Sequence, residues 1–265
     1  MIALLPDGLE IAYDDAGAGL PLLLLHGWPH DRSLWAGQLH GLVAHARCVA
    51  PDLRGFGGST VAPPFTIDQY ADDVAALMNV LGIERAVIGG LSMGGYIALS
   101  LLRRHRERIR ALVLADTRAT ADTDEVRANR MRLIALVEEH GIEALAARQL
   151  RPTLGRSTFE HHPEIVEAVR RMMASSPAAG AIGALRAMAA RPDSTGLLAH
   201  IDVPTLVVGG VEDTFTPPSE LEALAAAIPG GRLELLERCG HVCPIERPAA
   251  FNHVVSEFIA TLVCD

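Results

Sequence analysis

The chain has 265 residues, of which 49% are hydrophobic, and its formal net charge is −9. This length predicts a globular protein with a sizeable core, and no apolar run approaches the roughly 20 residues of a membrane span. The negative charge offers no basic surface for a nucleic-acid backbone. We therefore expect a small-molecule partner, no nucleic acid and no membrane. No secretory signal opens the chain, so we expect a cytoplasmic location.

The predicted elements begin with an antiparallel hairpin, because apolar residues 2–5 and 9–13 flank the turn Pro6-Asp7-Gly8. Beyond it, short apolar runs alternate with helical patterns, which predicts a largely parallel sheet with helices on both faces. The further strands are expected at residues 22–25, 47–50, 86–89, 111–115, 205–208 and 233–236. Helices are expected at residues 67–81, 95–104 and 248–262.

The alternation of strands and helices stops between residues 118 and 198. This stretch shows helical patterns at 124–140, 141–149, 163–174 and 178–190, and it is too long for a loop between sheet elements. We expect a helical cap (lid) at residues 118–198 and a core domain made of residues 1–117 and 199–265. The alanine, leucine and methionine content of the cap predicts an aliphatic, adaptable pocket.

A candidate nucleophile lies directly behind the predicted strand at residues 86–89. The segment Gly90-Leu91-Ser92-Met93-Gly94 fits the pattern G-x-S-x-G between a strand and a helix. The chain must turn sharply here, and side chains at the two flanking glycines would collide with neighbouring backbone. The helix that follows points its N-terminal amides at the serine, which favours developing negative charge. Ser92 is therefore the predicted nucleophile.

A serine nucleophile needs a base, and the base needs an orienting carboxylate. His241 is the predicted base, because it follows the strand at 233–236 in a glycine-containing loop. Asp213 and Asp116 both follow predicted strands and compete for the orienting role. We favour Asp213, because the order Ser, Asp, His is the one expected with this kind of serine turn. Asp116 also has a structural alternative, as a cap at the entry to the helical insertion.

Two amides are predicted to stabilise an oxyanion at this serine. The Met93 amide follows Ser92 directly, and the second donor is expected in His26-Gly27-Trp28-Pro29 after the strand at 22–25. Pro29 has no N–H, so the Trp28 amide is the predicted donor.

No metal site and no cofactor are expected. Cys239-Gly240-His241-Val242-Cys243 lacks the spacing and the second ligand pair of a zinc site. The four cysteines (Cys48, Cys239, Cys243 and Cys264) are too few for a disulfide scaffold.

Four motifs in this order resemble the α/β-hydrolase superfamily nearly end to end. They are His26-Gly27-Trp28-Pro29, Asp52-Leu53-Arg54-Gly55-Phe56-Gly57-Gly58-Ser59, Gly90–Gly94 and Gly240-His241. The resemblance implies an eight-stranded sheet whose second strand is antiparallel, with residues 118–198 as the cap. It also implies that Asp52 and Arg54 are structural and hold their turn together.

Within that superfamily, Ser92 argues against the branches that use an aspartate nucleophile, the haloalkane dehalogenases and epoxide hydrolases. The segment around Ser92 looks like those of small carboxylesterases, enol-lactonases and cofactor-free haloperoxidases. These relatives share a triad, so the motifs do not separate their activities. We expect a serine esterase that acts on a small-molecule ester of a small or medium acyl group, with lactonase or perhydrolase activity as the alternative. A thioesterase, a carbon–carbon bond hydrolase and a non-catalytic ligand receptor of the same fold are further alternatives.

Overall fold

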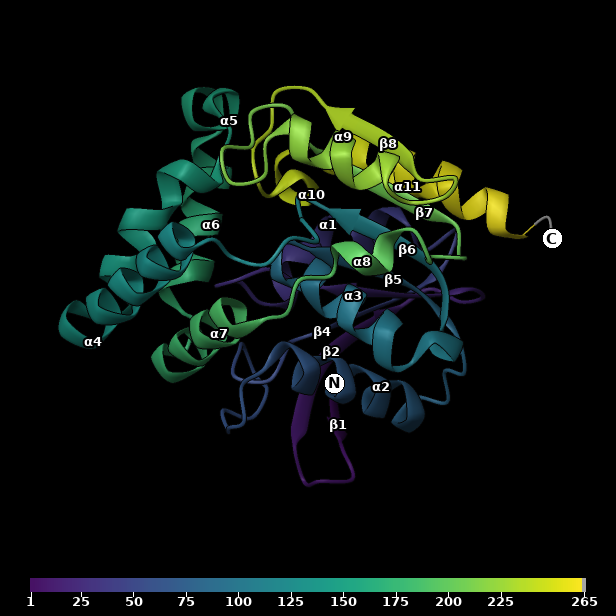
Figure 1. Cartoon of the computed structure of the whole chain (residues 1–265), viewed down its shortest axis with the longest axis horizontal. Helices are drawn as coiled ribbons and strands as arrows, with labels where there is room; N and C mark the ends of the chain where they lie inside the picture. The colour runs from purple at the N-terminus through teal and green to yellow at the C-terminus, as the bar shows by residue number, and fades with distance from the viewer. Residues whose placement is uncertain (264–265) are drawn as a thin grey trace.

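The computed structural model describes residues 1–263, and an eight-stranded sheet runs through the middle of the molecule (Figure 1). The strands are β1 (Ile2–Leu4), β2 (Glu10–Ala16), β3 (Pro21–Leu25), β4 (Arg47–Pro51), β5 (Ala86–Leu91), β6 (Ile109–Ala115), β7 (Thr205–Gly210) and β8 (Arg232–Leu236).

The spatial order of the strands is β1-β2-β4-β3-β5-β6-β7-β8. β2 runs antiparallel to both of its neighbours, β1 and β4, and every other neighbouring pair is parallel. The predicted α/β fold, with a mostly parallel eight-stranded sheet and an antiparallel second strand, is therefore confirmed. The carboxyl ends of β3, β5, β6, β7 and β8 meet along one edge of the sheet, where parallel sheets place functional groups.

Helices cover both faces of the sheet because side chains alternate in direction along each strand. In β3, Leu23 and Leu25 pack into a core shared with α2 (Ile67–Val80), α3 (Met93–Arg104) and α9 (Pro218–Ala226). Leu22 and Leu24 pack into a second core on the other face. That core is shared with α1 (Ala36–Gly41), α10 (Cys243–Glu246) and α11 (Pro248–Val263).

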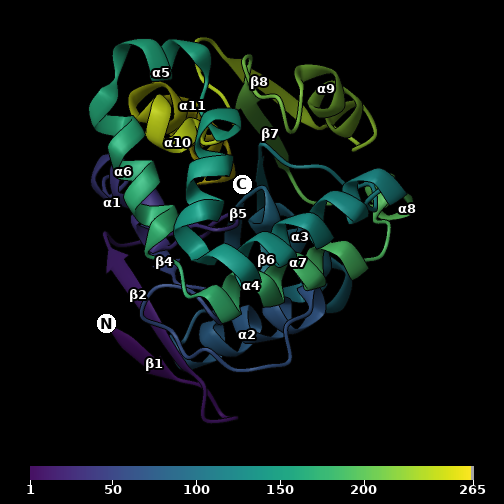
Figure 2. The ribbon, with the colours of Figure 1, turned by 90° about the vertical axis from the view of Figure 1, so that its left-hand side faces the viewer.

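Four helices between β6 and β7 lie together at one side of the sheet, at the left of Figure 1 and facing the viewer in Figure 2. They are α4 (Asp124–Thr153), α5 (Arg156–His161), α6 (Pro163–Ala174) and α7 (Ala178–Ala190). α4 packs against both α6 and α7. Gly141 has φ 79° and ψ 178° inside α4, so the chain kinks where the sequence predicts one helix to end and the next to begin. We propose that residues 118–198 form a cap, and we use this name for them below.

The sequence did not predict the shorter helices. α1, α5, α8 (Thr195–Leu198), α9 and α10 have between four and nine residues, and two 3-10 turns occur at Arg32–Trp35 and Arg106–Arg108. Segments of one or two turns contain too few apolar repeats to produce a helical periodicity. Cys264 lies outside the described residues.

Candidate active site

Ser92 lies at the tight turn between β5 and α3 and has φ 53° and ψ −111°. A non-glycine residue at positive φ is strained and persists only where the surrounding structure holds it. The two glycines permit the turn. A Cβ at Gly90 would lie 2.2 Å from the carbonyl oxygen of Gly94, and one at Gly94 would lie 2.2 Å from that of Leu25. Both contacts are with backbone, so the steric reason inferred from the sequence holds.

The structure brings Ser92, His241 and Asp213 together. Along the chain, His241 is 149 positions from Ser92 and 28 positions from Asp213. His241 Nδ1 lies 2.8 Å from Asp213 Oδ2, and His241 Nε2 lies 2.8 Å from Ser92 Oγ. The carboxylate accepts a hydrogen bond from Nδ1–H, so Nε2 is left to accept a hydrogen bond from the Ser92 hydroxyl. The three side chains thus form one continuous hydrogen-bonded chain that ends on the serine oxygen.

Asp213 is held rigidly by its own loop. Its Oδ1 accepts hydrogen bonds from the amides of Phe215 at 2.7 Å and Thr216 at 3.1 Å, which leaves Oδ2 to His241. The ring of Phe215 also meets His241 edge to face, with centroids 5.1 Å apart. A carboxylate fixed in this way orients the imidazole and stabilises its protonated form.

Asp116, the competing acid, takes a different position. Its Oδ1 accepts a hydrogen bond from the Gly210 amide at 2.9 Å, and its Oδ2 lies 3.4 Å from the Cys243 amide. These bonds tie together the segments that carry Asp213 and His241. Burial raises the pKa of Asp116 to about 8, and the charge of Asp213 adds to this effect. A side chain that is neutral at pH 7 is poorly suited to stabilise an imidazolium.

Opposing effects set the pKa of His241. Burial alone would lower it, but the charge of Asp213 and the hydrogen bond to Asp213 outweigh burial and raise the pKa above 6.5. The pKa of a general base that works near neutral pH lies close to this range.

The predicted oxyanion donors flank Ser92. Met93 is the first residue of α3, and Trp28 lies in the loop after β3. Within residues 1–263 neither amide donates a hydrogen bond to the protein. A Cβ added to Gly27 would lie 3.2 Å from Ser92 Cβ, so this loop runs directly beside the serine.

His26 fixes that loop, a role that the sequence analysis missed. Its Nε2 accepts a hydrogen bond from the Leu53 amide at 3.0 Å, so Nδ1 carries the proton and donates to the Gly27 carbonyl at 2.9 Å. Burial lowers the pKa of His26, which keeps the ring neutral. The signal for this role in the sequence was the position of His26 directly before Gly27.

The turn after β4 supports the loop from the other side. Asp52 accepts hydrogen bonds from the amides of Arg32 and Gly58, both at 2.7 Å. Arg54 binds Asp73 through two hydrogen bonds of 2.7 Å. Asp52 and Arg54 therefore hold this turn together, as expected from the sequence.

A cavity of about 530 Å³ lies over Ser92. Trp28, Tyr96 and His241 line it from the core, and Val126, Leu133 and Met188 are its apolar lining residues from the cap. Charged side chains also line it, namely Arg118, Asp122, Glu125, Arg130, Arg132 and Glu220.

The aliphatic pocket expected from the composition of the cap is thus wrong. Leu145, Met173 and Leu185 are fully buried among other helices, and they fill the core instead of lining the cavity. The composition of the cap reflects packing between helices, whereas the cavity is lined by both apolar and charged side chains of α4, α7 and the neighbouring loops.

Within residues 1–263, no three His, Cys, Asp or Glu side chains are grouped in a way that could hold a metal ion. Burial raises the pKa of Cys239 and Cys243, so both remain thiols and poor metal ligands. In the same part of the chain no helix is both long and apolar enough to span a membrane.

The serine of this site lies in a strand–turn–helix motif at the carboxyl edge of a mostly parallel sheet. It is hydrogen-bonded to a histidine, which is in turn hydrogen-bonded to an aspartate, and both come from later loops. This arrangement defines a class of hydrolases. The family model described as the alpha/beta hydrolase fold matches residues 21–248. The chain therefore belongs to the α/β-hydrolase family, as its motifs predicted. A hydrolase fold implies a small-molecule substrate.

Similar proteins carry several activity names. A thermophilic esterase from Thermogutta terrifontis, solved with malate bound, is 40% identical with a TM-score of 0.95, over 99% of this chain and 98% of that one. The 3-oxoadipate enol-lactonase 2 of Acinetobacter baylyi is 33% identical over 84% of this chain and 82% of its own length. A Mycobacterium tuberculosis protein that carries the name of a non-heme bromoperoxidase is 29% identical, over 96% of this chain and 99% of its own.

Proposed function

We propose that this protein is a serine hydrolase that cleaves carboxylic esters of small to medium acyl groups through an acyl-enzyme on Ser92. The observation that carries the proposal is the unbroken chain of two 2.8 Å hydrogen bonds from Asp213 through His241 to Ser92. The serine ends this chain in a strained turn and opens into the cavity. This arrangement serves nucleophilic attack, whereas a broken triad is the signature expected of a non-catalytic receptor of the same fold.

The proposed mechanism follows from the geometry. His241 Nε2 takes the hydroxyl proton as Ser92 Oγ attacks the ester carbonyl, and the Trp28 and Met93 amides stabilise the oxyanion. The imidazolium, stabilised by Asp213, returns the proton to the leaving alcohol. Water then attacks the acyl-enzyme with His241 again as the base, and this releases the acid. No cofactor takes part in any step.

Lactone hydrolysis is the second candidate function. The enol-lactonase relative favours it, because a lactone is an internal ester and needs the same steps. Perhydrolysis, in which peroxide replaces water, is an alternative side activity, since Pro29 beside Trp28 lines the cavity and a relative carries a bromoperoxidase name. The cytoplasmic location and the absence of a nucleic-acid partner stay predictions.

The first experiment is hydrolysis of p-nitrophenyl esters from acetate to decanoate by the wild type and by Ser92→Ala. We expect turnover that peaks at short or medium chains and a loss in kcat of at least roughly a thousandfold in the variant. A fluorophosphonate should label the wild type and not the variant. A folded wild type that neither turns over these esters or lactones nor takes the label would refute the proposal and favour a receptor.

A further inference from the structure

Beside the cavity over Ser92, one buried carboxylate faces two arginine side chains that are largely shielded from water. The Asp122 carboxylate, with 2% of its side chain exposed, lies between two guanidinium groups. Arg191 donates to Asp122 Oδ1 at 2.5 Å, and Arg130 donates through Nε to Oδ2 at 2.5 Å. The side chains of Arg191 and Arg130 are 3% and 14% exposed. Arg191 is buried and Arg130 is partly buried, so one carboxylate faces two guanidinium groups and one positive charge is left over.

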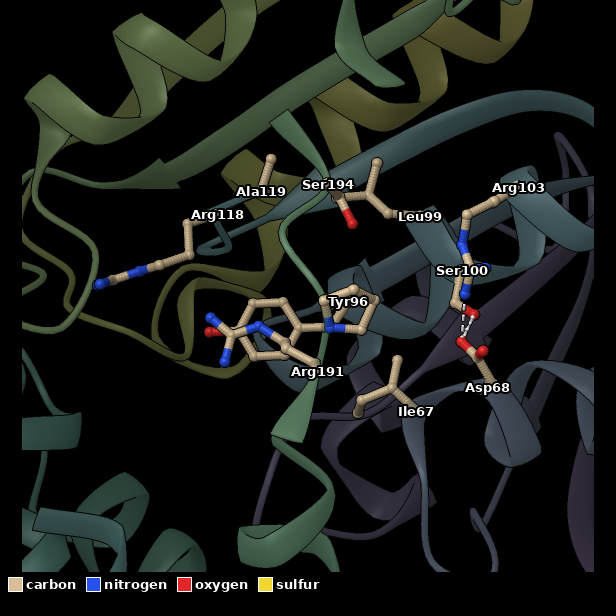
Figure 3. Close-up of a pocket in the computed structure, with 11 residues that line it drawn as sticks. Ile67, Asp68, Tyr96, Leu99, Ser100, Arg103, Arg118, Ala119, Arg191 and Ser194 are labelled. Atoms are coloured by element: carbon tan, nitrogen blue, oxygen red, sulfur yellow. Dashed lines mark hydrogen bonds and ion pairs between the residues drawn. The ribbon is translucent and has the colours of Figure 1, made fainter. Parts of the chain in front are cut away.

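Arg191 is the better satisfied of the two arginines. Besides Asp122, it donates to the carbonyl oxygens of Met188 at 2.8 Å and Thr120 at 2.7 Å. Its guanidinium also lies over the ring of Tyr96, 3.9 Å from the centroid, as Figure 3 shows. Arg191 therefore neutralises Asp122 from behind the cavity wall, and it is not itself a lining residue of the cavity.

Arg130 is the cation that remains available to a ligand. It lies in α4 and lines the same cavity as Ser92. Nε and Nη2 face Asp122, but within the described residues Nη1 meets only the thioether sulfur of Met188, at 3.4 Å. A thioether is a weak acceptor, so Nη1 keeps strong unused donors for an oxygen atom in the cavity.

Other charges around the cavity do not cancel that of Arg130. Arg118 and Glu220 form their own ion pair at 3.0 Å. Glu125 and Arg132 line the cavity, are both exposed to water and have opposite signs. Asp193 is also exposed, and its carboxylate accepts hydrogen bonds from the Ala121 and Thr195 amides. Water screens these exposed charges far more than it screens the cluster at Asp122.

We propose that Arg130 recognises a carboxylate on the substrate, so that the enzyme selects esters or lactones whose non-reacting end is anionic. The bound carboxylate accepts hydrogen bonds from Nη1 and supplies the missing negative charge. This inference rests on the proposed ester hydrolysis at Ser92 and adds to it the chemical class of substrate.

The test uses matched pairs of esters. The anionic members are the monomethyl esters of succinate, glutarate and adipate. In each neutral partner a CH(CH₃)₂ group replaces the carboxylate, as in methyl 6-methylheptanoate for monomethyl adipate. Because a charged hydrogen bond is lost in the neutral ester, we expect kcat/KM to favour the anionic member of at least one pair by roughly 10- to 100-fold.

Variants assign the preference to one residue. Arg130→Gln should bring the ratio of the two kcat/KM values close to one, and Arg130→Lys should keep part of it, since a lysine retains the charge without the planar fork. Arg127→Gln is the matched control, because Arg127 also lies in α4 but pairs with Asp124 on the exposed surface. Thermal denaturation checks folding, and Arg130→Lys carries the test if Arg130→Gln does not fold. A wild type without an anionic preference, or an unchanged ratio in the folded Arg130 variants, would overturn the proposal.

A binding measurement separates this inference from the proposed function. Calorimetric titration of the same esters into Ser92→Ala should show tighter binding of the anionic member, and Arg130→Gln in that background should abolish the difference. If the wild type cleaves none of these esters, no p-nitrophenyl ester and no lactone, and takes no fluorophosphonate label, but this binding difference is present, ester hydrolysis is refuted and Arg130 recognition is supported. Equal binding of both members would refute Arg130 recognition.

Discussion

The two walls of the cavity over Ser92 are built in different ways. The core wall consists of strand ends and tight turns, in which the backbone itself sets the position of Ser92, His241 and the amides of Trp28 and Met93. The cap wall consists of side chains from α4 and the loops beside it, held by ion pairs such as that of Arg130 with Asp122. We infer that the core wall sets the chemistry, and we propose that the cap wall decides which substrate binds.

The largest effect expected at the core wall concerns the two competing acids. Asp213→Asn should lower kcat by about 10³- to 10⁴-fold, because an amide facing Nδ1 no longer holds the imidazole in the required tautomer. Asp116→Asn should cost less than about tenfold, since burial already keeps Asp116 neutral at pH 7. Steady-state kinetics on one p-nitrophenyl ester compares the two variants. A larger loss at Asp116 would assign the orienting role to the other acid.

The turn at Ser92 should not tolerate a single added methyl group. In Gly94→Ala the new Cβ would lie 2.2 Å from the Leu25 carbonyl oxygen. Relieving that clash moves backbone, so we expect the free energy of unfolding to fall by about 2 to 3 kcal/mol. Urea denaturation measures this change. Gly196→Ala is the control, because a Cβ at Gly196 in α8 meets nothing within 4 Å. Equal stability of the two variants would contradict the steric argument.

The pKa of His241 predicts the acid limb of the pH profile. Only the neutral imidazole accepts the serine proton, so activity is present above the pKa of His241 and is lost as the pH falls through it. Because Asp213 raises that pKa, the acid limb of kcat/KM should lie above pH 6.5 and fall about tenfold for each pH unit below its midpoint. A midpoint below 6.5 would mean that burial, and not Asp213, controls the imidazole.

The smallest expected effect lies where the two walls meet. The indole Nε1 of Trp28 donates a hydrogen bond of 3.0 Å to the Ala181 carbonyl in α7. Trp28→Phe removes this bond and should cost about 1 kcal/mol, which corresponds to a fall in Tm of about 2 to 4 °C. We expect kcat to fall as well, because the Trp28 amide is then held less firmly. Unchanged Tm and kcat would show that the bond contributes nothing to either wall.

The sequence predicted the core wall far better than the cap wall, for a physical reason. Around Ser92 the glycines and the turn are required by local sterics, so a short motif specifies both the backbone and its chemistry. The alternation of strands and helices predicted a largely parallel sheet with helices on both faces, whereas the eight strands and the antiparallel second strand were implied by the family resemblance. Two helices of the cap, α6 and α7, also begin and end as expected, whereas the shorter α5 and α8 were not predicted.

What the sequence did not reveal is which cap side chains line the cavity. The ion pairs of Asp122 with Arg130 and Arg191 span 8 and 69 residues along the chain. They depend on how α4 and α7 pack against each other, which no local pattern encodes. The role of His26 was missed for the same reason, because its partner Leu53 comes from a different loop.

Trp28 has a consequence for building chimaeras from relatives of this protein. Its main-chain amide lies in the core wall beside Ser92, and its indole donates a hydrogen bond to the Ala181 carbonyl in α7. A foreign cap grafted onto this core would therefore have to bring a carbonyl oxygen to the place of the Ala181 carbonyl, or be transplanted together with residues 26–29. Because Trp28 contacts both walls, we expect that exchanging the cap alone would also lower kcat.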